Sequence, residues 1–403
     1  YVRSVPTSNG ATIEQYYCCN FAIADDLGVS VIAKNEPPEF QDYADYAGFL
    51  QRSVDAVCAN AGDPLRGLKF RPLTTVSSGY DSPAGAVLAM RAGCNEALTF
   101  ATAREEFSDG DDSGQKIGER LGLTVKDFDR TEYRRLGGLP EAEFLATGMG
   151  GEDVVMKAFE ADLPGTILFT GFHGDKVWHY GNHKVSKTII RGDASGGSLG
   201  EFRLRVGFIH LPIPFVGCLQ HPSIDRVTMS DEMKPWFVDR ETRGGRIYNR
   251  PLPRRLVEEA GVPREWFGQD KRAVTQPLAF VPREPWLSNM PLANVLSPES
   301  LEDFTRYLRS IRPATSKQHP FFSFMHGLYA VNQRVAWRLA KAIKGDDRNP
   351  QNLIRVHWRY QYPLTEHLWG FHWGVETIRD RYESAKNSVE PDGRGFSGSA
   401  IVQ

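Results

Sequence analysis

The stretch Thr74-Thr75-Val76-Ser77-Ser78-Gly79-Tyr80-Asp81-Ser82-Pro83-Ala84-Gly85 joins a short apolar run to a helical pattern. Three serines in it offer hydroxyl donors: Ser77, Ser78 and Ser82. Gly79 allows a ligand to approach the backbone closely, Ser82 is a good helix N-cap, and Pro83 suits the first helical turn. Free amides and the positive end of the helix dipole would then meet at this junction. The stretch predicts a phosphate site, although a capped turn without a ligand has the same sequence pattern.

The segments around this junction alternate between short apolar runs and helical patterns. The expected strands cover residues 73–76, 97–101, 125–128 and 166–170. The expected helices cover residues 46–61, 83–91, 113–121 and 154–161. Such alternation predicts an α/β fold, with a parallel sheet covered by helices on both faces. From about residue 250 onward the patterns are largely helical, over residues 252–260, 301–311, 324–343 and 365–386.

These patterns divide the chain into four segments. Residues 1–65 hold short β-like runs, an acidic linker and a helix, and residues 66–190 form the expected phosphate-binding α/β domain. Residues 191–249 are expected to be an irregular insertion. Residues 250–403 are expected to be a helical region that completes the active site.

Composition and charge narrow the classes of function. The chain has 403 residues, a net charge of −2 and no long basic tract, so a broad nucleic-acid-binding surface is not expected. Its five cysteines are odd in number and lack a CxxC spacing, which argues against a disulfide framework and a four-cysteine zinc site. No apolar run reaches the length of a membrane helix, and no signal peptide opens the sequence. We therefore expect a cytoplasmic protein with no membrane partner.

Residues 77–82, SSGYDS, resemble the SGGxDS loop of the PP-loop ATP pyrophosphatases, with Ser78 at the place of the first glycine. The resemblance implies the adenine nucleotide alpha hydrolase-like fold and a loop that binds the phosphates of ATP. Asp81 supplies a carboxylate of the kind that binds Mg²⁺, the usual companion of ATP phosphates. In this family, backbone groups at the end of the second strand, here Thr99 and Phe100, hold the adenine.

Two further segments resemble asparagine synthetases. Residues 111–123 resemble the helix that precedes the third strand of those enzymes. Residues 166–178 resemble the segment SGEGADELF, with Thr170 and Gly171 at its Ser-Gly and Asp175 at its aspartate. By that resemblance Asp175 binds the second side of the Mg²⁺–pyrophosphate complex, and carboxylates on two loops bridging metal and phosphate form a sensible electrostatic arrangement.

Residues 250–272 resemble the helix and loop that deliver an active-site lysine in those enzymes, and Lys271 stands at the place of that lysine. A lysine there would neutralise the charge that builds on the α-phosphate and the pyrophosphate. Phe172, His173 and Lys176 replace the glutamate, glycine and glutamate of the asparagine synthetase segment. Since these positions contact the acceptor substrate in the family, asparagine itself is not the expected product.

Histidines near this segment suggest two further interpretations. His173 lies within the phosphate segment and is a candidate general base for the attacking amine, with Tyr180 as a second candidate. A metal site formed by His173, His179 and His183 is disfavoured, because no loop or helix context supports it. Polar packing or solvent exposure is the alternative for each of these side chains.

The resemblance implies an ATP-dependent carbon–nitrogen ligase, an amidotransferase of asparagine synthetase type that activates a carboxylate as an acyl-adenylate and releases AMP and pyrophosphate. The expected substrates are a small-molecule or peptide carboxylate and an amine or ammonia. The stretch between Tyr1 and Ser77 is too short for the glutaminase domain of those enzymes. We therefore expect that a separate glutaminase supplies ammonia, that a free amine is the nucleophile, or that a glutaminase domain lies upstream of Tyr1. A homo-oligomer is open as well. The alternatives are a PP-loop enzyme that modifies a nucleobase or tRNA, and a non-catalytic protein that binds nucleotide.

Overall fold

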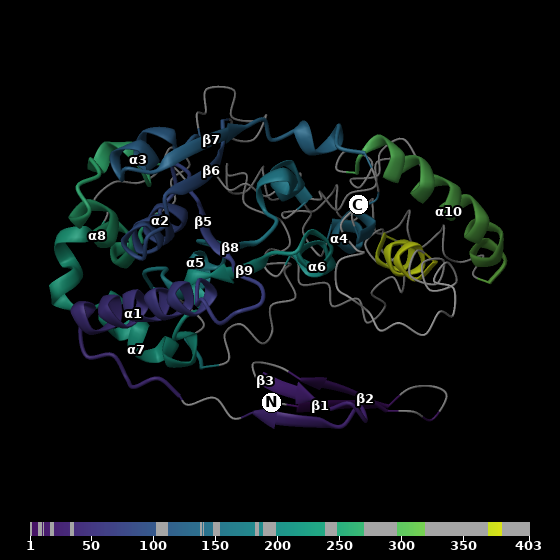
Figure 1. Ribbon diagram of the computed structural model, residues 1–403, viewed down its shortest axis with the longest axis horizontal. Helices are drawn as coiled ribbons and strands as arrows, with labels where there is room; N and C mark the ends of the chain where they lie inside the picture. Colours follow the sequence, from purple (N-terminus) through teal and green to yellow (C-terminus); the bar gives the residue numbers. More distant parts are fainter. Residues whose placement is uncertain are drawn as a thin grey trace, which may run out of the picture. The chain divides into compact units, whose positions relative to one another are not determined.

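The computed structural model of the chain describes residues 2–6, 10, 12–16, 20–32, 36–101, 112–137, 139, 141–147, 154–181, 185–187, 199–237, 248–269, 296–318 and 370–380 (Figure 1). The chain forms two compact units. The first spans residues 1–132, 158–199 and 206–274, and the second spans residues 133–157, 200–205 and 275–403. These limits differ from those of the four segments expected from the sequence. Residues 77–82 and 166–178 both belong to the first unit.

The first unit is built on a five-stranded parallel sheet (Figure 1). Its strands are β5 (Arg71–Thr75), β6 (Glu96–Phe100), β7 (Thr124–Phe128), β8 (Thr166–Thr170) and β9 (Ile209–Pro212). Their order across the sheet is β7-β6-β5-β8-β9, and every neighbouring pair is parallel. Thr74 in the central strand is in register with Ala97 on one side and Phe169 on the other. The predicted α/β fold with a parallel sheet is confirmed.

Helices flank this sheet on both faces. The α-helices that share one hydrophobic core with the sheet are α1 (Tyr43–Ala61), α2 (Asp81–Arg91), α3 (Gln115–Arg120), α7 (His221–Thr228) and α8 (Pro251–Glu259). Ala97 contributes the β6 side chain to this core. Phe100 points to the opposite face, because strand side chains alternate, and it stacks on Phe159 of the 3-10 helix η2 (Val154–Asp162) with 4.5 Å between ring centroids.

The sequence pattern predicted the existence of helix α1 correctly but misplaced its first residue. Tyr46, Leu50 and Val54 are buried at four-residue spacing, which places them on one face of the helix. The apolar spacing predicted a start at residue 46, but the helix begins at Tyr43. The reason is Asp42, whose side chain caps the helix by accepting a 2.8 Å hydrogen bond from an amide of the first turn.

The chain between β8 and α8 forms elements that the sequence patterns left unassigned. Residues 207–222 contain the edge strand β9 and the start of α7, where prolines and aromatics obscured any simple period. The short elements of this stretch are α5 (Gly174–Val177), η3 (Ile213–Phe215), η4 (Cys218–Gln220) and η5 (Asp231–Trp236). After α8 comes η6 (Arg264–Trp266). Helix α8 packs against α2 (Figure 1), so this later part of the chain lies beside the helix that follows the predicted phosphate loop.

Residues before α1 form two antiparallel hairpins. Their strands are β1 (Val2–Pro6) with β2 (Thr12–Tyr16), and β3 (Asn20–Ile23) with β4 (Val29–Ile32). The short 3-10 helix η1 (Glu132–Arg134) follows β7. No helix in the described part of the chain is both long and apolar enough to cross a membrane.

The second unit contains several helices around small clusters of buried side chains. They are α4 (Glu141–Thr147), α6 (Gly200–Val206), α10 (Pro298–Gln318) and a helical segment at residues 370–380. Residues 142–146 of α4 are left-handed, with φ between 43° and 54°. Trp373 packs on Phe304 of α10 and donates a 3.0 Å hydrogen bond to Asp303. The expected helix at 324–343 lies outside the described residues.

Candidate phosphate-binding site

The strand order creates a switch point between β5 and β8. The chain leaves β5 toward β6 on one side and leaves β8 toward β9 on the other. In open α/β sheets, ligands bind where the order reverses, outside the carboxyl ends of the strands. The loop before α2 follows β5, and the loop before α5 follows β8. The sheet therefore brings residues 77–82 and 166–178, the two predicted phosphate segments, to one place.

The hydroxyls of the first loop organise the loop itself. Ser77 Oγ and Ser82 Oγ lie 2.6 Å apart, and the Gly79 amide donates to Ser77 Oγ at 3.3 Å. Ser78 Oγ donates to Asp112 Oδ1 at 2.7 Å, and the Ser78 amide donates to the Asp112 carbonyl at 3.1 Å. The serine at the place of the family's first glycine thus ties the loop to the segment that precedes α3.

The end of β6 is tied to the same segment. Thr99 Oγ1 accepts a 2.8 Å hydrogen bond from the Gly114 amide. The Phe100 ring lies 5.4 Å from the Arg130 guanidinium, which in turn pairs with the buried Asp112 at 3.6 Å. The Thr99 side chain therefore accepts a hydrogen bond from this segment, and the Phe100 side chain packs beside Arg130. An adenine contact would rest on their backbone groups and stays a prediction.

Helix α2 begins earlier than predicted, and the expected cap is wrong. Its first residue is Asp81, and Tyr80 rather than Ser82 is the cap residue. Tyr80 makes no side-chain capping bond, while Ser82 Oγ turns to Ser77 instead. Within the described residues, the start of this 11-residue helix therefore has no side-chain cap. Its first backbone amides lack intrahelical acceptors and, with the helix dipole, favour an anion.

Two glycines of the second loop lie directly against this helix start. A Cβ on Gly171 would lie 2.3 Å from the carbonyl carbon of Asp81, and a Cβ on Gly174 would lie 2.3 Å from the Asp81 Cγ. A side chain at either position would force the neighbouring atoms of Asp81 to move. Thr170, the residue before them, has its Oγ1 2.8 Å from His210 Nε2. Of the two residues matched to Ser-Gly, the glycine contacts the predicted site and the threonine side chain bonds to β9.

The carboxylate of Asp81 forms an ion pair with Arg250. The Arg250 side chain is 2% exposed and that of Asp81 is 20% exposed. Among the described residues, neither Asp81 Oδ1 nor Arg250 Nε has a hydrogen-bond partner, and both atoms are buried. The guanidinium also lies 5.0 Å from the centroid of the Tyr248 ring. Burial lowers the pKa of Arg250 to about 9, which leaves the side chain charged at neutral pH.

These groups fit a metal–phosphate ligand such as Mg²⁺–ATP. Asp81 Oδ1 is a buried carboxylate oxygen whose bonding capacity is not met within the described residues. Burial raises the pKa of Tyr248, and Asp112 and Asp175 raise it further, so the Asp175 carboxylate acts on the same cluster. No group of three or more His, Cys, Asp or Glu side chains in the described ranges could hold a metal. Phosphate oxygens would have to complete the ligand set, which is how Mg²⁺ usually binds with nucleotides.

A later segment of the chain anchors the loop from the other side. Tyr80 is fully buried, and its hydroxyl accepts a 2.8 Å hydrogen bond from Arg264 Nη2. The Gly268 amide donates to the Ser78 carbonyl at 2.7 Å. Gly268 precedes Lys271 by three positions in the sequence. Lys271 itself lies outside the described residues, so its predicted role is not tested.

The candidate general base has a weakly basic ring. His173 adopts φ 65°, and its ring stacks on that of Phe215 at 4.6 Å. Burial lowers the pKa of His173 to about 4, Lys176 lowers it further, and Asp175 opposes the shift. A base with such a pKa is poorly matched to proton transfer near neutral pH. The Asp175 side chain, two positions on, is exposed at the start of α5.

The remaining candidates add little to the site. The Tyr180 ring packs on Phe237 with 4.6 Å between the centroids. His183 lies outside the described residues. Sequence reasoning missed Arg250 and Asp112, which sit beside the loop in space. One feature marked Arg250 in the sequence, its place immediately before a proline at a predicted helix start. Nothing else in the sequence distinguished it from the other arginines of the same segment.

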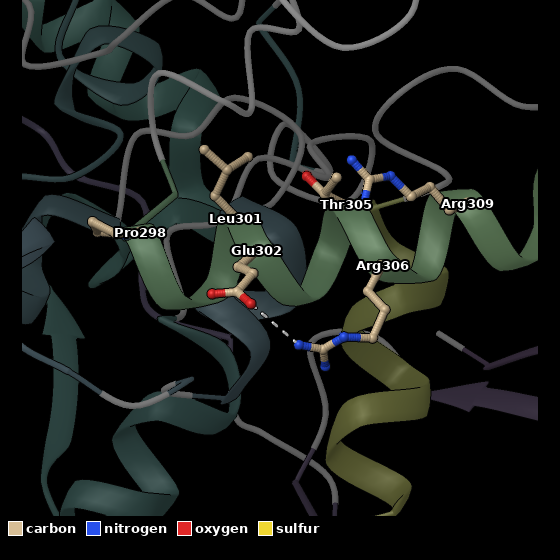
Figure 2. Close-up of a pocket in the computed structure, with 6 residues that line it drawn as sticks. All are labelled: Pro298, Leu301, Glu302, Thr305, Arg306 and Arg309. Atoms are coloured by element: carbon tan, nitrogen blue, oxygen red, sulfur yellow. Dashed lines mark ion pairs between the residues drawn. The ribbon is translucent and has the colours of Figure 1, made fainter.

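Figure 2 shows a hollow elsewhere in the chain, on helix α10, with Glu302 and Arg306 paired at 3.6 Å. Its described lining comes from this one helix and includes none of the predicted site residues. The chain matches no protein-family model, and a search of the curated proteins finds no match either. The resemblance to PP-loop enzymes thus rests on the sequence motifs.

Proposed function

We propose that this protein is an ATP-dependent carbon–nitrogen ligase that activates a carboxylate as an acyl-adenylate and releases AMP and pyrophosphate. The observation that carries the proposal is the uncapped start of α2 at the β5–β8 switch point, closed in by Gly171 and Gly174. A helix N-terminus at this place of a parallel sheet is a favourable site for phosphate. The loop sequence SSGYDS adds the resemblance to ATP pyrophosphatases.

The proposed reaction has two steps. A carboxylate oxygen of the substrate attacks the α-phosphorus of ATP, the bond to the β-phosphate oxygen breaks, and pyrophosphate leaves. The nitrogen of an amine or ammonia then attacks the acyl carbon, loses a proton, and displaces AMP to leave an amide. The amides at the start of α2 would stabilise the charge that develops on the leaving pyrophosphate.

Other residues have expected roles in this scheme. Asp81 and Asp175 would hold Mg²⁺, which when bound neutralises phosphate charge. Lys271 would add positive charge at the α-phosphate, as the resemblance implies. Phe172 and His173 replace the residues found in asparagine synthetases, so asparagine is not the proposed product.

Product analysis tests the proposal directly. The full chain is incubated with ATP, Mg²⁺ and pools of carboxylates and amines, and the nucleotide products are separated. We expect AMP and pyrophosphate in amounts that depend on the added carboxylate. ADP and phosphate as the products would contradict the proposed class.

Two variants assign the activity to this site. Asp81→Asn and Lys271→Ala should each lower turnover by a factor of about 100 or more, since each removes a charge from the transition state. Arg91→Gln is a matched control, because Arg91 is exposed in the last turn of α2, at the end away from the loop. Full turnover in either site variant would remove the residue from the scheme.

The ion pair between Asp81 and Arg250 favours a second candidate, a protein that binds nucleotide without turning it over. In that case the predicted metal ligand would be permanently engaged by an arginine. Binding of Mg²⁺–ATP without products in any substrate pool would support this candidate. Carboxylate-dependent formation of AMP would exclude it.

A further inference from the structure

Arg250 is an unusual residue to find beneath the candidate site. It is the N-cap residue of α8, and its side chain is almost completely buried. Its guanidinium pairs with Asp81 and lies beside the Tyr248 ring, but Nε has no hydrogen-bond partner among the described residues. Burying a cation costs free energy, and a buried N–H donor without an acceptor adds to that cost. Such a group points to a role in binding.

Asp81 shows the matching feature on the other side of the ion pair. Its Oδ1 is buried and has no hydrogen-bond partner within the described residues. The carboxylate therefore has one oxygen toward Arg250 and one without a partner. Beyond their ion pair, Asp81 Oδ1 can accept a cation and Arg250 Nε can donate to an anion. A divalent cation bound to phosphates supplies both at once.

We infer that Arg250 couples metal binding to phosphate binding at this site, an inference that rests on the proposed function. Without nucleotide, the guanidinium neutralises Asp81 and opposes binding of a divalent cation alone. When the cation arrives with phosphates, their negative charge compensates the guanidinium, and Asp81 binds the metal. Arg250 is thus a positioning residue that makes the site select the metal–phosphate complex over the free metal.

Coulomb interactions predict the direction in which loss of the Arg250 charge changes the affinities for metal and for phosphate. A positive charge a few ångström from a carboxylate weakens cation binding there and strengthens binding of a nearby phosphate. Removal of that charge should therefore shift the two affinities in opposite directions. A purely structural role for Arg250 predicts instead that both affinities fall together when the site loosens.

The first experiment measures two probes with the full chain, wild type and Arg250→Gln. Mn²⁺ alone is titrated by electron paramagnetic resonance, and metal-free inorganic pyrophosphate is titrated by calorimetry. In Arg250→Gln we expect Mn²⁺ to bind about tenfold more tightly and pyrophosphate about tenfold more weakly. Arg91→Gln, with the same loss of charge at the far end of α2, should change neither affinity. Unchanged affinities in a folded Arg250→Gln, or a fall in both, would overturn the inference.

A second variant keeps the test decisive if Arg250→Gln does not fold. Asp81→Asn leaves the guanidinium without its counter-charge, so metal-free pyrophosphate should bind about tenfold more tightly than to wild type, while Mn²⁺ binding is lost. Equal or weaker pyrophosphate binding in this variant would contradict the inference. A wild-type protein that binds neither Mg²⁺–ATP nor pyrophosphate would sink the proposed function and this inference with it. Normal Mg²⁺–ATP binding with no opposite shifts would sink the inference alone.

Discussion

The backbone amide of Gly268 donates a 2.7 Å hydrogen bond to the carbonyl of Ser78, and so joins two parts of the chain that are far apart in sequence. Gly268 has φ 61°, and a Cβ there would lie 2.3 Å from the Tyr80 ring. Only glycine allows the backbone to come this close. The contact fixes the later segment against the predicted phosphate loop.

Tyr80→Phe tests whether this anchor matters for ligand binding. The change removes the acceptor of the 2.8 Å bond from Arg264, and we expect a loss of about 1–2 kcal/mol in the free energy of unfolding. We also expect weaker binding of Mg²⁺–ATP, because the loop loses one of its supports. Urea denaturation and calorimetry measure the two effects.

Tyr43→Phe is the matched control for this prediction. The Tyr43 hydroxyl donates a 3.0 Å bond to Glu259, at the other end of α8 from the loop. This variant should lose a similar amount of stability and keep its nucleotide affinity. If both variants lose the same affinity, the anchor at Tyr80 has no special role.

Replacement by alanine should affect stability differently at Gly79 and at Gly174. A Cβ on Gly79 would meet Ser77 Oγ at 3.4 Å and the Tyr248 hydroxyl at 3.7 Å, which are ordinary contacts. Gly79→Ala should therefore change the free energy of unfolding by less than about 1 kcal/mol. We expect it to weaken Mg²⁺–ATP binding about tenfold, because the backbone at the proposed phosphate position becomes covered.

Gly174→Ala supplies the contrast. Its Cβ would lie 2.3 Å from Asp81 Cγ, so the loop or the carboxylate must move, and we expect a loss of about 1–3 kcal/mol. Thermal unfolding of the two variants compares them. If the Gly79→Ala protein is fully stable and binds Mg²⁺–ATP as tightly as the wild type, the nucleotide does not contact the backbone at Gly79.

Ser78→Ala tests the departure from the family loop. The hydroxyl donates a 2.7 Å hydrogen bond to the buried Asp112, and its loss leaves a carboxylate oxygen with one donor fewer. We expect a destabilisation of about 1–3 kcal/mol in urea denaturation. Ser53→Ala is a fair control, since Ser53 Oγ only returns a bond to the Phe49 carbonyl within α1, and it should change stability by less than about 0.5 kcal/mol.

His221 predicts a pH dependence of stability. Burial lowers its pKa from the ordinary value of 6.5, and its Nδ1 accepts a 3.3 Å hydrogen bond from the Ser186 amide, which requires an unprotonated nitrogen. The carboxylate of Asp225 opposes the shift without reversing it. Because the unfolded chain then binds the proton more readily, the free energy of unfolding should fall as pH drops below about 6.5.

His221→Asn removes this ionisation while it keeps an acceptor near the Ser186 amide. Urea midpoints measured between about pH 5 and pH 8 should show a smaller slope in the variant than in the wild type. Identical slopes would mean that His221 does not change its protonation on unfolding.

Local patterns were sufficient for most elements of the first unit. The alternation of apolar runs and helical periods predicted β5, β6, β7 and β8 and the helices α2 and α3, because each of these elements shows its period within a few neighbouring residues. The helix expected at residues 154–161 is the 3-10 helix η2. The patterns did not predict β9, because His210 and Pro212 interrupt the run of apolar residues that would indicate a buried strand. They also misplaced the start of α2, since Ser82 had a closer partner in Ser77 than its own helix amides.

By itself, the sequence determined the class of the fold and the loop at residues 77–82, since both follow from periodicity and from the special chemistry of glycine and serine over a few neighbouring positions. Only the tertiary structure decided which distant residues contact this loop. Asp112, Arg250 and Gly268 reach it through contacts between residues that are distant in sequence. No local pattern encodes such contacts, because they depend on the order of the strands and on which buried charges and amides the folded sheet brings within bonding distance.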